Sequence, residues 1–220
     1  TLAEHLDHVR EVLLVLRRDK LFATKKKCEF GSSQVHFLGY IVSARGLAVD
    51  PTKVEAIKTW PTPSTLTEAR SFHGLASFYR RFVAQFSSLM APLTDCIRRE
   101  VQFVWTAEAD TAFEAIKRKL SSAPVLALPD FSQVFELHCD ASKTGIGAVL
   151  SQRRRPIAFF SEKISGARMR YSTYDIEFYA VVKSIKHWRH YLFHKEFVLF
   201  TYHDELKHLS SQDKVSARHA

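Results

Sequence analysis

The chain has 220 residues, 46% of them hydrophobic, which is enough to bury the core of one large domain or two small ones. Its formal net charge of +9 suggests a polyanionic partner, although charge alone fits an ordinary basic protein equally well. Three widely spaced cysteines argue against a disulfide framework or a zinc site and fit a reducing compartment. No apolar run approaches the roughly 18 residues that a membrane-spanning helix needs.

The first fifty residues predict a helix and a β-hairpin. Apolar residues recur at helical spacing over 2–22, and the lysines at 25–27 form either a solvated face or a phosphate contact. Residues 35–42 are rich in β-formers, residues 43–46 are typical of a turn, and residues 47–49 would form the returning strand of the hairpin. The chain begins within a helical pattern and ends without a closing element, so we expect it to be part of something longer.

Residues 50–98 predict a helical unit. Asp50 and Pro51 are typical of a helix start, and we expect that helix to reach about Thr59. Thr65 and Glu68 form a capping box for the next helix, and a short last helix is expected from Ala91.

An aromatic stripe follows the capping box at intervals of three or four residues and predicts a buried helix face: Phe72, Leu75, Tyr79, Phe82 and Phe86. Arg70, Arg80 and Arg81 lie outside this stripe, so they could face a phosphate backbone.

A helix capped by Thr106 and ending near Ser121 connects this unit to the rest of the chain. Pro124 and Pro129 bound an extended linker, which predicts a domain boundary near Asp130 and proteolytic cleavage within 121–131.

The C-terminal half predicts a mixed sheet. Strands are expected at 134–139, 146–150, 156–161 and 196–201, with an arginine tip at 153–155 and a crossover helix capped by Ser172 and Asp175. A final helix is expected at 205–209, capped by Asp204. The order β-β-β-α-β-α gives three antiparallel strands and a fourth reached by a crossover.

Asp140 ends the first of these strands, where a carboxylate is costly unless a charged or hydrogen-bonding group meets it. One reading is that Asp140 only caps the turn through Ser142 and Lys143. The other is that it is functional. Separately, Glu177 falls in the first turns of the crossover helix, among apolar neighbours.

Several segments resemble the pol polyprotein of gypsy-type LTR retrotransposons: residues 75–82 (LASFYRRF), 91–94 (APLT), 103–106 (FVWT), 138–142 (HCDAS) and 171–177 (YSTYDIE). Phe37, Leu38, Gly39 and Tyr40 resemble the hairpin near the primer grip. The resemblance covers essentially the whole chain. It implies the end of a reverse transcriptase palm over 1–49, the thumb over 50–98, a connecting helix and linker over 99–130, and a C-terminally truncated ribonuclease H-like domain over 131–220. The implied fold class is therefore α/β (α+β), a helical thumb with a β-hairpin followed by a ribonuclease H-like mixed sheet.

The resemblance implies two Mg²⁺ ions held by convergent carboxylates, with Asp140 as a shared ligand and Glu177 as a second. The family's third acidic position is occupied by Tyr202, a neutral phenol and a poor Mg²⁺ ligand. The fourth carboxylate and the polymerase aspartates fall outside the chain, so we expect this chain to be catalytically defective. Asp204 could in principle replace the missing third carboxylate, but we interpret it as the N-cap of the following helix.

The resemblance implies RNA-directed DNA synthesis and hydrolysis of RNA in a hybrid as the family reactions. It implies RNA–DNA hybrid or primer-template nucleic acid and the rest of the polyprotein as partners, in a cytoplasmic virus-like particle or the nucleus. Two alternatives remain: a non-catalytic nucleic-acid-binding or subunit-interface module, and an actin-like ATPase. The second needs a repeat of residues 140–147 in another domain, and the sequence has no such repeat.

Overall fold

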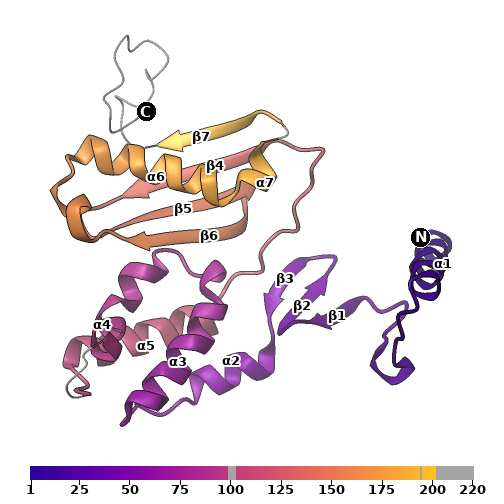
Figure 1. Ribbon diagram of the computed structural model, residues 1–220, viewed down its shortest axis with the longest axis horizontal. Helices are drawn as coiled ribbons and strands as arrows, with labels where there is room; N and C mark the ends of the chain where they lie inside the picture. Colours follow the sequence, from indigo (N-terminus) through magenta and orange to yellow (C-terminus); the bar gives the residue numbers. More distant parts are fainter. Residues whose placement is uncertain (99–102, 194, 202–220) are drawn as a thin grey trace.

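The computed structural model describes residues 1–98, 103–193 and 195–201. A helical part with a small sheet lies beside a four-stranded sheet that α6 covers on one face (Figure 1). This is the predicted fold class, a helical N-terminal part followed by a mixed ribonuclease H-like sheet. In the part of the chain that the structure describes, no helix is long and apolar enough to cross a membrane.

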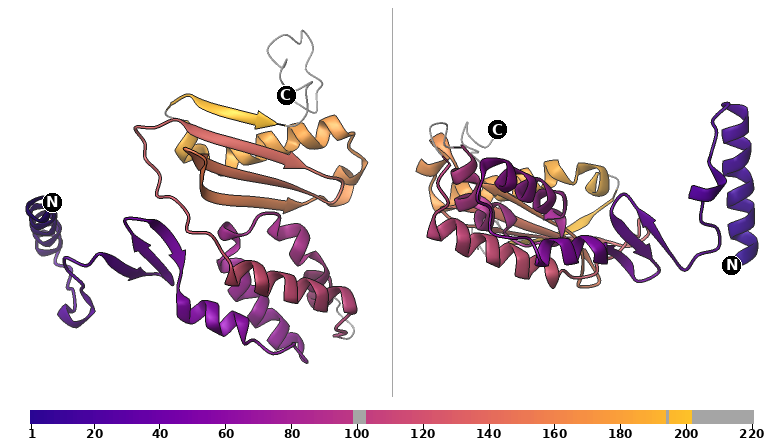
Figure 2. Two further views of the ribbon diagram at one scale, coloured as in Figure 1. Left: turned by 180° about the vertical axis from the view of Figure 1, so that it is seen from behind. Right: turned by 90° about the horizontal axis from the view of Figure 1, so that it is seen from below.

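The first helix, α1 (Leu2–Arg18), stands apart from the rest of the molecule (Figure 2). Thr1 and Glu4 form a reciprocal capping box at its start, and Arg17 and Arg18 complement the helix dipole at its end. None of its residues is buried, and Leu6, Val12 and Leu13 of its apolar stripe are 50–58% exposed.

The small sheet is a three-stranded meander: β1 (Gln34–Phe37), β2 (Tyr40–Ser43) and β3 (Gly46–Val49). The expected β-hairpin with its turn at 43–46 is present as β2 and β3, while the β-formers over 35–42 are divided between β1 and β2. Leu38 and Gly39 both take positive φ, 48° and 79°, which is the geometry of a two-residue hairpin turn. The β-formers on both sides belong to two strands paired in register, Phe37 with Tyr40.

The thumb-like unit consists of α2 (Pro51–Lys58), α3 (Leu66–Phe78), a 3-10 turn (Arg80–Phe82), α4 (Phe86–Arg98) and α5 (Ala107–Ser121). The predicted caps at Asp50, Thr65 and Thr106 are all present. Two boundaries were wrong: the stripe-bearing helix ends at Phe78, and the next helix begins at Phe86 rather than at Ala91. The aromatic stripe nevertheless stays buried, apart from half-buried Leu75, because the 3-10 turn continues it across the break.

The helices, β3 and the segment after α5 share one hydrophobic core, which includes Ile57, Phe72, Tyr79, Phe82, Leu93, Phe113, Ile116 and Leu126. Leu126 is fully buried, and its backbone forms a bridge with Leu47 through hydrogen bonds of 2.8 and 2.9 Å. The middle of the predicted linker is therefore docked against β3, and proteolytic cleavage within 121–131 stays a prediction.

The large sheet contains β4 (Phe135–Ala141), β5 (Gly145–Gln152), β6 (Arg155–Lys163) and β7 (Phe197–Thr201) in the order β6-β5-β4-β7. Neighbours are antiparallel except β4 and β7, which are parallel, as the crossover prediction required. Arg153 and Arg154 form the β5–β6 turn with positive φ, and Arg155 is already in β6.

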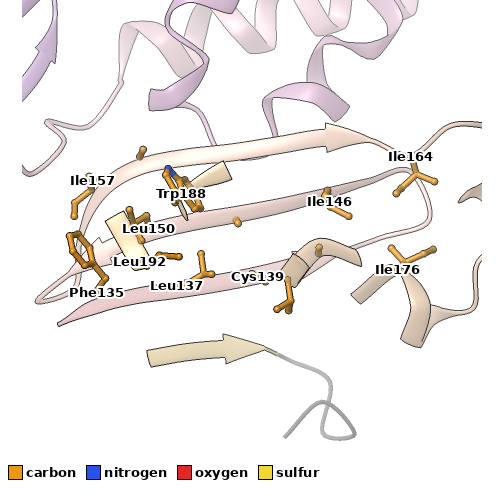
Figure 3. Packing of buried hydrophobic residues seen from close by; sticks show 14 residues of the cluster. Phe135, Leu137, Cys139, Ile146, Leu150, Ile157, Ile164, Ile176, Trp188 and Leu192 are labelled. Atoms are coloured by element: carbon orange, nitrogen blue, oxygen red, sulfur yellow. The ribbon is translucent and has the colours of Figure 1, made fainter. Parts of the chain in front are cut away.

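The crossover runs through α6 (Thr173–His187) and α7 (Arg189–Leu192), so the single crossover helix that we expected is divided at Trp188. Ser172 and Asp175 form the predicted capping box. The second core lies between α6 and the sheet and is drawn in Figure 3; it includes Phe135, Leu137, Cys139, Ile146, Leu150, Ile176, Ala180 and Trp188. Tyr202, Asp204 and the helix expected at 205–209 lie outside the described residues.

Candidate nuclease site and nucleic-acid surface

Asp140 lies near the end of β4 with its side chain exposed. Residues alternate along this strand, so Leu137 and Cys139 are buried under α6 and Asp140 belongs to the other set. The β4–β5 turn is capped by Ser142, whose hydroxyl donates to the Gly145 carbonyl oxygen at 3.1 Å. Asp140 accepts a hydrogen bond at Oδ2 from Gln85 Nε2, at 3.2 Å, across 55 positions of sequence.

Glu177 approaches β4 from the α6 side of the sheet. Glu177 is only 7% exposed. It lies five positions after Ser172, the N-cap of α6. Burial raises the pKa of the Cys139 thiol to about 11, and the negative charge of Glu177 acts in the same direction. Glu177 is therefore close enough to interact with the residue that precedes Asp140.

Carboxylate oxygens are ligands that Mg²⁺ accepts, so Asp140 and Glu177 fit a divalent ion in kind. Tyr202, which we expect at the third acidic position of the family pattern, lies outside the described residues. Among residues 1–98, 103–193 and 195–201, no three or more His, Cys, Asp or Glu side chains are grouped so that they could hold a metal ion. A pocket of about 270 Å³ lies beside Asp140 and is lined by Gln85, His138, Gly147 and Phe159, among others.

The hairpin tip predicted to grip nucleic acid is anchored to the end of α3. The Tyr79 hydroxyl donates to the Gly39 carbonyl oxygen at 2.8 Å, and the Tyr40 ring stacks on Phe78 at 5.1 Å between centroids. Burial raises the pKa of Tyr79 to about 12, with smaller contributions from nearby groups, so its hydroxyl stays a donor. Phe37 and Leu38 project from the tip, 59% and 72% exposed.

The three predicted arginines differ in what they contact. Arg70 is exposed on α3 and Arg81 is half-buried. Arg80 instead donates to the carbonyl oxygen of Ser161 on β6 at 2.6 Å and to the hydroxyl of Ser87 at 3.3 Å. Arg80 thus joins the helical part to the sheet, a contact that spacing along one helix could not reveal.

Comparisons with known proteins agree with this fold. Residues 105–199 match the family described as "RNase H-like domain found in reverse transcriptase". The fold and the match define the class: a reverse transcriptase region with an RNase H-like domain. The match begins before α5, so the predicted boundary near residue 130 stays a prediction.

The chain is homologous to the reverse transcriptase/RNase H-like region of a gypsy-type retrotransposon polyprotein. The Transposon Tf2-3 and Tf2-4 polyproteins of Schizosaccharomyces pombe are each 39% identical to it over 195 residues. These alignments cover 86% of this chain and 15% of either relative, so the chain spans a small part of their length.

Two solved structures of the foamy viral protease-reverse transcriptase show the same fold. One, in complex with RNA/DNA hybrid, gives a TM-score of 0.82 at 22% identity and covers 99% of this chain and 31% of that one. Another, in complex with double-stranded DNA, gives the same TM-score and identity with coverages of 100% and 47%.

Proposed function

We propose that this chain is a segment of a retrotransposon reverse transcriptase/ribonuclease H that binds RNA–DNA hybrid and whose nuclease site is impaired. The observation that carries the proposal is the placement of Glu177 beside Cys139, one residue from Asp140, within a ribonuclease H-like sheet. The family, the basic charge and the hybrid-bound foamy viral relative support the choice of ligand. An intracellular site, in a virus-like particle or the nucleus, follows from the same proposal.

The hairpin tip and the thumb would supply the grip. Arg70 and Arg81 are cations that can neutralise phosphates, and such contacts release counterions and make binding depend on salt. Phe37 and Leu38 offer apolar surface to a sugar or a base, and the Tyr79–Gly39 hydrogen bond holds the turn in place. These contacts position a duplex without reading its sequence.

The nuclease step would depend on Asp140 and Glu177 as oxygen donors. Divalent ions bound there would stabilise the attacking and leaving oxygens of the phosphodiester. Two carboxylates are too few to hold two such ions against their mutual repulsion, and Tyr202 adds bulk without charge. We therefore expect little or no cleavage of the RNA strand.

A non-catalytic nucleic-acid-binding module is the second candidate, and Tyr202 favours it. A sheet that keeps its fold but lacks one acidic ligand can still act as a binding platform or a docking surface for a subunit. Mg²⁺-dependent cleavage separates the two candidates, since only the first requires cleavage to appear when Tyr202→Asp is combined with an extension of the chain that supplies the fourth carboxylate.

The test uses an RNA–DNA hybrid labelled on its RNA strand. The hybrid is incubated separately with the unmodified chain, with the Tyr202→Asp variant, and with the Asp140→Asn variant, which controls for contaminating nuclease. We expect no cleavage by the unmodified chain and tighter Mg²⁺ binding by Tyr202→Asp, because an acidic oxygen is restored. Robust cleavage by the unmodified chain that disappears in Asp140→Asn would refute the impairment and make Asp204 the leading third ligand.

A further inference from the structure

Gln85 links the helical part to Asp140 at some conformational cost. Its φ of 57° lies in the left-handed region, which Gly and Asn adopt more readily than a long side chain does. A carboxylate can only accept, so the Gln85 amide must present its NH₂ group to Asp140 Oδ2, and that hydrogen bond helps to offset the backbone cost.

The sheet has room for this side chain because two residues of β5 are glycines. A Cβ atom on Gly147, the register partner of Asp140, would lie 2.6 Å from Gln85 Nε2. A Cβ atom on Gly145 would lie 2.7 Å from Ser88 Oγ. Segment 85–88 therefore fits a recess that the glycines create along β5.

Further polar contacts hold the same segment on the neighbouring strand. Ser87 donates its backbone N–H to Ser161 Oγ at 2.9 Å and its hydroxyl to the Ser161 carbonyl oxygen at 2.8 Å. Lys163 forms an ion pair with Asp95 at 3.2 Å. Phe159 of β6 adds an apolar contact with the thumb-side core, but such a mainly polar seam resembles interfaces across which domains move relative to one another.

We propose that Gln85 is a positioning residue through which the thumb-like unit orients the Asp140 carboxylate, so that docking of segment 85–88 and the orientation of Asp140 are coupled. The proposal deepens the proposed function, since it gives the candidate nuclease carboxylate a partner from the nucleic-acid-binding half. Among the residues that the structure describes, the hydrogen bond from Gln85 engages Oδ2 and leaves Oδ1 available to a ligand. Because linkage is reciprocal, any change that displaces segment 85–88 should alter the orientation of the Asp140 carboxylate. A change at Asp140 should likewise alter the docking of that segment.

The experiment swaps the amide of Gln85 and the carboxylate of Asp140 in the full chain and measures hydrogen exchange at a backbone amide. The Ser87 backbone amide reports docking, because its N–H is bonded to Ser161 across the seam. Gln85→Glu, similar in size, sets two carboxylates against each other and should speed hydrogen exchange at that amide about tenfold. Asp140→Asn alone should change it less, because Asn can still accept. The double variant Gln85→Glu/Asp140→Asn restores one donor facing one carboxylate and should return exchange to within about twofold of the starting chain.

Two controls complete the design. Gln85→Gly removes the side chain at a φ that Gly adopts readily. It should speed hydrogen exchange at the Ser87 amide and leave the fold intact. Gly74→Ala, where an added Cβ meets nothing within 4 Å, should leave Ser87 unchanged. The coupling would be overturned if the two substitutions changed the exchange rate of the Ser87 amide additively in the double variant. It would also be overturned if Gln85→Glu left that rate unchanged. Neither result depends on hybrid binding or cleavage, so failure of the proposed function would be seen separately.

Discussion

The docked segment after α5 makes a sharp stability prediction. Leu126 is fully buried in the thumb-side core, and its backbone is bonded to Leu47 in both directions. Deleting a fully buried leucine side chain costs about 3–5 kcal/mol, the upper part of the usual range, when the cavity cannot collapse. The helices around it can remain folded, because a domain has about 5–15 kcal/mol in total and the segment can detach locally.

Leu126→Ala should therefore raise the rate of limited proteolysis within 121–131 by about a hundredfold, since 3 kcal/mol of lost local stability corresponds to about two powers of ten. Val125→Ala is the matched control, because Val125 is 41% exposed and its replacement should cost under about 1 kcal/mol. Equal cleavage rates for Leu126→Ala and the unmodified chain would refute the reasoning. So would ready cleavage of the unmodified chain at 125–127.

Three further predictions concern titratable and charged groups. Replacing Arg70 and Arg81 together with Ala should flatten the slope of log affinity for hybrid against log salt by about one to two, and an unchanged slope would place the phosphate contacts elsewhere. Burial, followed by the charge of Arg98, lowers the pKa of His73, so the unfolded chain takes up this proton first. Stability should then fall as the pH drops below about 6.5, and urea midpoints of His73→Gln should fall less over the same range. Burial and Glu177 raise the pKa of Cys139, so its thiol should react with a disulfide reagent far more slowly at pH 8 than that of an unfolded control; equal rates would contradict the packing.

Local chemistry made the helix starts predictable. Asp50, Thr65, Thr106 and Ser172 each accept a backbone N–H from within three residues, so the sequence carries the whole signal. The strands of the large sheet were likewise marked by β-formers between turn residues, and their order followed from the crossover.

Breaks within apolar runs were not predictable in this way. Leu38 and Gln85 adopt positive φ although neither residue type favours it, and each divides what looks like one element. Pro92 lies inside α4, although it had suggested a helix start. In each case tertiary contacts decide the local geometry.

The candidate site was only partly predictable for the same reason. Asp140 and Glu177 stand out by type, strand position and resemblance. Gln85, Ser161 and the space at Gly147 become visible only when residues more than fifty positions apart meet.

Hybrid binding is the central claim, and a fluorescence anisotropy titration of a labelled RNA–DNA hybrid with the full chain tests it most directly. We predict saturable binding with a dissociation constant at or below about 10⁻⁵ M in low salt, weakening at least tenfold as salt approaches the physiological range. Absence of binding at that concentration, or binding that salt leaves unchanged, would contradict the account.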